Sequence, residues 1–96
     1  MQFLENNVVY STDTATYLGY CEYYYRSKHR FRLYKTQEGK LFSTERHISF
    51  FTKIEIYHMG FRTWDSLEKI INFLVNNRDV SINEAEKLVG ITLKRG

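Results

Sequence analysis

The pattern of apolar and polar positions changes once along the chain, near Met59 and Gly60. Before that point apolar residues alternate with polar ones, a period of two that is typical of strands with one buried face. After it, apolar residues recur every three or four positions, as in amphipathic helices. The pattern therefore predicts an α+β fold, with a β-sheet region over 1–59 and a helical region over 60–96.

The first region divides into about five strands separated by short polar turns. The predicted strands are Asn7–Ser11, Ala15–Tyr25, His29–Lys35, Lys40–Ile48 and Phe51–His58. Gly39 suits the left-handed position of a hairpin loop over 36–39, and residues 26–28 form a second polar turn. Because such short turns join antiparallel neighbours, we expect one antiparallel N-terminal sheet.

The two predicted hairpins assign the side chains to faces, because opposed residues share a face. A turn over 26–28 pairs Tyr23 with Phe31, and a turn over 36–39 pairs Leu33 with Phe42. The face predicted for the core carries Tyr17, Cys21, Tyr23, Phe31, Leu33 and Phe42. The opposite face carries Tyr20, Glu22, Tyr24, Arg30, Arg32, Tyr34 and Glu45.

The second region predicts two helices packed on one face of the sheet. Thr63 is the expected N-cap of the first helix. The apolar stripe of that helix is Trp64, Leu67, Ile70, Ile71 and Leu74. A capping box over 81–84 begins the second helix, and Gly90 ends it. No proline or Ser/Gly linker interrupts the 96 residues, so we expect a single domain over 1–96.

Composition adds a tyrosine-rich, mildly basic character. Aromatic residues make up 17% of the chain, including eight tyrosines, and the net charge is +3. The charge is too small for an obligate nucleic-acid binder, although it is compatible with an acidic partner. The one cysteine excludes an internal disulfide, and no apolar run approaches a membrane span. With no signal-like start, we expect a cytoplasmic protein without a membrane partner.

The sequence offers little equipment for catalysis. It contains no phosphate loop, nucleophile elbow or zinc-protease motif. Cys21 is the one candidate thiol nucleophile, and it falls on the predicted core face. The three histidines lack the spacings that direct two ligands to one metal ion. We therefore expect no enzyme activity, no metal site and no cofactor.

A basic segment, Arg26–Lys35, is the sharpest local feature, with five cations in ten residues. The candidate binding residues on it and on the preceding strand are Tyr20, Tyr24, Arg26, Lys28, Arg30, Arg32 and Tyr34. In one interpretation the arginines contact phosphates while the tyrosines stack on bases. In the other, acids on the neighbouring strands neutralise the arginines.

The second interpretation follows from the predicted register. It places Glu22 opposite Arg32, and Glu45 opposite Arg30. The face would then carry a network of cross-strand ion pairs beside the tyrosines, a surface better suited to binding a protein than bare nucleic acid. Arg26 and the nearby Lys28 keep no predicted partner, so the hairpin tip is the better place for an anionic contact.

Three segments resemble a family of small bacterial and phage accessory proteins. The segments are Val9–Thr16, Leu33–Phe42 and Ser81–Ala85. The family opens with Y-D/S-T-x-T-A, continues with an L-Y-K/R-T-x-x-G-x-x-F hairpin and often closes with an S/T-x-x-E-A helix. Residues from about 46 to 79 have no counterpart in this pattern, and Ser11 replaces the commoner Asp. The resemblance implies a binding protein of a mobile element, among which inhibitors of host defence, including anti-CRISPR proteins, are frequent.

Two functions of different classes stay open at this point. The first is inhibition of a host protein or ribonucleoprotein complex, such as a CRISPR effector, through the Tyr/Arg surface. The second is direct binding of nucleic acid by the sheet tyrosines and the basic tip. A homodimer formed through a sheet edge, with Phe50 and Phe51 as candidate contacts, is compatible with either.

Overall fold

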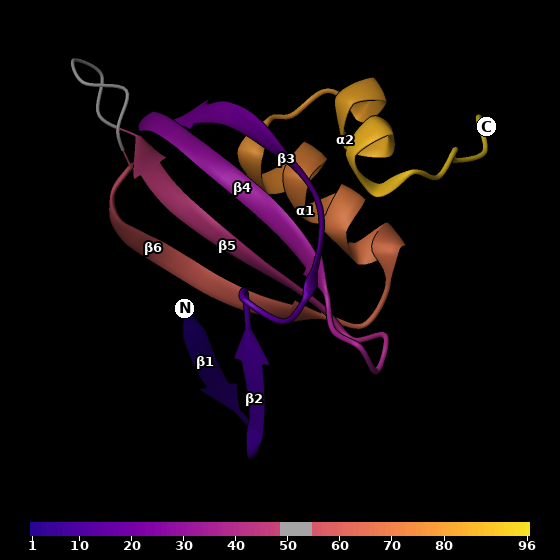
Figure 1. Ribbon diagram of the computed structural model, residues 1–96. Coiled ribbons are helices and arrows are strands. Elements are labelled where there is room, and N and C mark those ends of the chain that lie inside the picture. The colour runs from indigo at the N-terminus through magenta and orange to yellow at the C-terminus, as the bar shows by residue number, and fades with distance from the viewer. Residues whose placement is uncertain (49–54) are drawn as a thin grey trace.

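A computed structural model describes residues 1–48 and 55–96, and side chains in 1–48 and 60–96. Within these residues the order is β1 (Gln2–Glu5), β2 (Val8–Ser11), β3 (Thr16–Tyr25), β4 (Ser27–Lys35), β5 (Leu41–Ile48), β6 (Glu55–Trp64), α1 (Leu67–Arg78) and α2 (Ile82–Val89). Figure 1 shows the two helices together on one side of a curved sheet. The predicted α+β fold is confirmed, whereas Phe50 and Phe51 lie outside the described residues.

The strands form two sheets rather than one. The larger is an antiparallel meander in the order β3-β4-β5-β6, and β1 pairs with β2 alone. Asn6 and Asn7 both have positive φ angles, 51° and 63°, which closes this first hairpin in two residues. The first strand, β1, was not predicted, and the last sheet strand extends to Trp64, five residues beyond the predicted end of the sheet region.

The main core lies between the large sheet and the helices. The sheet contributes three buried side chains, Tyr23, Phe31 and Leu33. The helices and their connection contribute Ile70, Ile71, Phe73, Leu74, Val80 and Ala85. Most of the predicted helical stripe is therefore buried as expected, with Trp64 meeting the same core from the end of β6.

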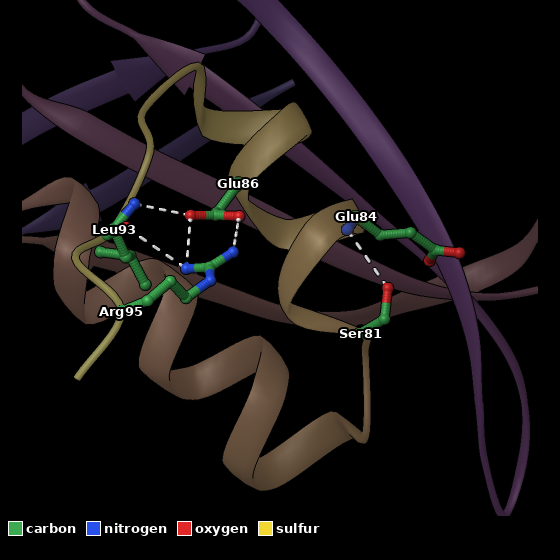
Figure 2. A network of polar contacts seen from close by, with 5 residues as sticks. All are labelled: Ser81, Glu84, Glu86, Leu93 and Arg95. Carbon is green, nitrogen blue, oxygen red and sulfur yellow. Dashed lines mark hydrogen bonds and ion pairs between the residues drawn. The ribbon is translucent and has the colours of Figure 1, made fainter.

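Each helix begins and ends at residues that satisfy its free backbone groups. The N-cap of α1 is Ser66, whose hydroxyl accepts a hydrogen bond from the Lys69 N–H, so the predicted Thr63 cap is wrong. The predicted cap of α2 is confirmed, because Ser81 accepts from the Glu84 N–H (Figure 2). After α2, Glu86 binds the Leu93 N–H and the Arg95 guanidinium, which ties the C-terminal tail to the helix.

The β1–β2 hairpin covers one end of the other sheet face with a second, aromatic cluster. Phe3 stacks on Phe61 with 4.4 Å between ring centroids. Tyr10 packs against both Phe61 and Phe42, at 5.5 and 5.4 Å. Phe42 is fully buried there, on the face opposite the helices. The prediction that it shares the helix-side face with Leu33 is therefore wrong.

The face of Phe42 was predicted wrongly because the predicted loop between β4 and β5 was one residue too long. The Thr36 N–H donates to the Lys40 carbonyl (2.8 Å), so the loop has three residues, with Gly39 at φ 86°. The predicted loop had four residues. A shift of one residue turns every side chain of β5 to the opposite face. Glu45 accordingly lies opposite Phe31, on the helix side.

The hairpin between β3 and β4 differs in another way. Its turn is the single residue Arg26 (φ 67°), so Cys21 lies opposite Phe31. This shift of two residues leaves the predicted faces unchanged. A bulge at Leu18 then moves Tyr17 opposite Tyr34, away from the helices, so its predicted core position is wrong.

Candidate functional site

The sheet face away from the helices is open over β3 and β4. We call this surface the tyrosine face, and its residues are Tyr17, Tyr20, Glu22, Tyr24, Lys28, Arg30, Arg32 and Tyr34. Tyr17, Tyr20 and Tyr24 are 49%, 56% and 68% exposed. Tyrosine rings are large, rigid and amphipathic, so three exposed rings on one strand have the physical properties of a recognition surface.

The described structure brings six of the seven predicted binding residues onto this face, and the seventh beside it. Arg26 lies at the hairpin turn, exposed, with its guanidinium 5.7 Å from the centroid of the Tyr25 ring. Tyr34 is half-buried, because its ring stacks on Phe42 and contacts Tyr17. It therefore supports the face rather than presenting a free ring. Tyr17 is a face residue that the predicted register missed.

One carboxylate organises the charges of the face. Glu22 accepts hydrogen bonds from Arg30, with 2.7 Å from Nε to Oε2, and lies 3.4 Å from Lys28 Nζ. Burial alone would raise the pKa of Glu22, but the Arg30 and Lys28 contacts hold it below its ordinary value. The predicted pairing of Glu22 with Arg32 is wrong, as is the expectation that Lys28 has no partner.

The face is more basic than the predicted register implied. Glu45, expected to neutralise Arg30, points toward the helices instead. Its place opposite Arg30 is taken by Arg46. Among the side chains described on β3, β4 and β5, this face carries four basic residues and one acid: Lys28, Arg30, Arg32, Arg46 and Glu22. The charges described on these three strands therefore give the surface a net positive balance.

Arginine and tyrosine also contact each other directly on the face. The Arg30 guanidinium lies 5.3 Å from the centroid of the Tyr20 ring, within the range of a cation–π contact. Arg30 is thus held by Glu22 and by Tyr20 together. Because these contacts already fix the Arg30 rotamer, less side-chain entropy would be lost on binding an anion there.

A second polar cluster lies on the helix side, and the sequence did not predict it. Glu45 accepts hydrogen bonds from the Tyr23 hydroxyl and from Arg78 Nε (2.7 Å). Burial opposes ionisation of Glu45, but these bonds hold its pKa below the ordinary value. Arg78 also covers the Tyr25 ring at 4.1 Å. The cluster joins α1 to the sheet.

The described residues offer no evident catalytic or metal-binding group. Burial, followed by the charges of Glu84, Glu45 and Glu22, raises the pKa of Cys21 to about 12. A thiol with that pKa stays protonated at neutral pH and is a poor nucleophile. In the described ranges, no three His, Cys, Asp or Glu side chains are placed to hold a metal ion.

These features define an α+β protein with helices on one face of its main sheet and an open, basic tyrosine face on the other. No family model, no curated protein and no solved structure matches the chain. Across the described residues, neither helix is long and apolar enough to cross a membrane.

Proposed function

We propose that the protein is a non-catalytic binding protein whose tyrosine face takes a single-stranded nucleic acid. The observation that carries the proposal is the charge balance of the side chains described on β3, β4 and β5, where one carboxylate and four basic residues lie beside three exposed tyrosines. Basic side chains attract the phosphates, and exposed aromatic rings stack on unpaired bases. Stacking contributes roughly 1–3 kcal/mol per base and needs little sequence specificity.

Each element of the face has a part in this proposal. Tyr20 and Tyr24 project from the edge strand, and each would stack on a base. Arg30 and Arg32, on the adjacent strand, would lie beside the phosphates between them. Arg26 would extend the basic track to the hairpin turn. Helices on the opposite face leave this surface to the ligand.

The test is fluorescence anisotropy with labelled oligo(dT) and oligo(rU) at low salt. We expect binding that weakens linearly in log salt, with a slope near −0.7 per phosphate contacted. The double variant Tyr20→Ala/Tyr24→Ala should lose tenfold or more, and Ile82→Ala, an exposed apolar control on α2, should lose nothing. Flat titrations with both oligonucleotides would rule the proposal out.

A second candidate is a host protein or ribonucleoprotein complex of a defence system, such as a CRISPR effector. It is supported by the motif resemblance and by the Glu22–Arg30–Tyr20 contacts, since arginine and tyrosine are enriched at protein interfaces. Pull-down from host lysate and phage plating with and without CRISPR test it. An unchanged plating efficiency with no captured complex would reject this candidate.

In either case we place the protein in the cytoplasm. Cys21 is unpaired and is the one cysteine in the sequence, which suits a reducing compartment. Both candidate partners, nucleic acid and a defence complex, are also found there.

A further inference from the structure

We propose that the free edge of β3 is a docking site for an extended segment of a partner protein, which adds to the sheet as a new strand and places a basic side chain against Glu84. This site is the edge of the sheet and the groove beside it, and it shares Tyr20 and Glu22 with the tyrosine face. Its occupant is an extended protein segment rather than a nucleic acid, so peptide binding and oligonucleotide binding test the two proposals separately.

The outer edge of β3 presents main-chain groups that no described strand pairs with. β3 is the end strand of the large sheet, and β4 is the one described strand that pairs with it. From Gly19 to Tyr25 this pairing is regular, without a bulge. In an antiparallel pair, every second residue directs its N–H and C=O away from the partner strand. Such groups are a template for another strand.

β3 also lacks the protection that edge strands usually carry. Its ten residues include one charged side chain, Glu22, and neither lysine nor proline. Five of the nine exposed large apolar side chains in the described residues lie on this strand: Tyr17, Leu18, Tyr20, Tyr24 and Tyr25. An edge of this length with one charge and many apolar side chains is a pairing surface.

A groove of about 570 Å³ lies between β3 and α2. Leu18, Cys21 and Leu88 supply its apolar lining. Gly19 allows the helix to approach, because a Cβ at that position would lie 3.2 Å from the Leu88 Cδ1. Side chains of an added strand alternate in direction, so one row would enter this groove.

The charge of the groove indicates the chemistry of the occupant. Glu84 lies on its rim, and Figure 2 shows its side chain pointing away from the Glu86–Arg95 network. No described residue pairs with its carboxylate, whereas Glu22, the other acid of the lining, is already bound by Arg30 and Lys28. The field of these acids contributes to the raised pKa of Cys21. A basic side chain among apolar ones fits this groove best.

A second copy of the chain fits less well. Antiparallel self-pairing over the whole regular edge, Gly19–Tyr25, is centred on residue 22. It sets Glu22 opposite Glu22 of the other copy, and like charges directly opposite one another destabilise a strand pair. We therefore assign the edge to a different protein, with the self-pair as an outcome that the experiment detects.

The test is NMR titration of the full ¹⁵N-labelled chain with seven-residue probe peptides. The first probe alternates valine with threonine and carries one lysine in the valine row. We expect shifts concentrated in the amides of Gly19–Tyr25. A matched peptide with glutamate in place of lysine should bind two- to fivefold more weakly, the effect of one exposed ion pair of up to about 1 kcal/mol. A proline-interrupted peptide should not bind.

Charge reversal makes the assignment sharper. Glu84→Lys should invert the preference, so that the glutamate peptide binds more tightly than the lysine peptide. Equal affinities for the two peptides in both proteins would overturn the role of Glu84. Unchanged β3 amides at millimolar peptide would overturn the docking site. A dimer detected by sedimentation, in which the same β3 amides are protected in the NMR spectra, would assign the edge to a second copy instead.

Discussion

Glu45 shows how much one residue's direction matters in this molecule. It lies between Tyr23 and Arg78, with 14% of its side chain exposed. Glu45→Gln keeps the shape but removes the charge that Arg78 needs. We expect a loss of about 2–4 kcal/mol in the free energy of unfolding at pH 7, measured by urea titration, because a buried cation loses its partner. Glu38→Gln, in the exposed hairpin loop, should change it by less than about 0.5 kcal/mol.

The same variant has a pH signature. The folded-state pKa of Glu45 lies below its ordinary value of 4.5. Its stabilisation is therefore complete above that value and is lost as pH falls through the folded-state pKa. Wild type should lose this part of its stability on acidification toward pH 3, whereas Glu45→Gln should lose less. An identical acid dependence in the two proteins would contradict the assigned role.

His29 acts in a different pH range. It is 4% exposed, and neither ring nitrogen has a hydrogen-bond partner among the described residues. Burial lowers its pKa from 6.5, and the opposing charge of Glu45 does not reverse the shift. The unfolded chain binds the proton more readily, so stability should fall as pH drops below about 6.5. His29→Leu should flatten the pH 7-to-5 part of the urea-midpoint profile.

At the scale of elements, Gly19 sets how closely β3 approaches α2. Its φ of 143° is one that side chains rarely adopt, and a Cβ would meet Leu88. Gly19→Ala should cost about 1–3 kcal/mol in thermal or urea unfolding. Gly60→Ala is the matched control, since nothing lies within 4 Å of the Cβ it adds. The control should be neutral or slightly stabilising, and equal losses in both variants would contradict this account.

The sequence predicted the elements well and their mutual register less well. Alternation placed Cys21 and Phe31 on the helix side, because the error at the first turn was two residues, an even number. It misplaced Phe42 and Glu45, because the loop between β4 and β5 has three residues, one fewer than predicted. Whether the Thr36 N–H bonds to Lys40 depends on loop geometry, which hydrophobic periodicity does not encode.

The candidate site was affected in the same way. Its tyrosines and arginines lie on β3 and β4, where the predicted faces were correct except for Tyr17, so six predicted residues do share one surface. Its charge balance depends on β5, where the predicted faces were inverted. The sequence therefore located the surface but overestimated its neutrality. That single loop residue decides that Arg46, and not Glu45, lies opposite Arg30.

At the scale of the whole molecule, one sheet separates two clusters of buried side chains. The helix side holds the larger core, and the β1–β2 hairpin covers the smaller aromatic cluster on the other side. Both depend on alternate side chains of the same strands: on β4, Leu33 lies in the helix-side core and the next residue, Tyr34, stacks on Phe42. Losing one cluster should therefore weaken the whole sheet rather than release the hairpin alone.

Phe3→Ala tests this coupling, because Phe3 joins β1 to the sheet through its stacked contact with Phe61. We expect a loss of about 1–3 kcal/mol, less than for a fully buried phenylalanine because the ring is half-exposed. Trp64 reports from the helix-side core through its contacts with Phe31 and Phe73. In the variant, its fluorescence and the far-UV circular dichroism should both shift to lower urea and still coincide, as two-state unfolding requires. A Trp64 transition left at the wild-type midpoint would mean that the hairpin unfolds as a separate unit.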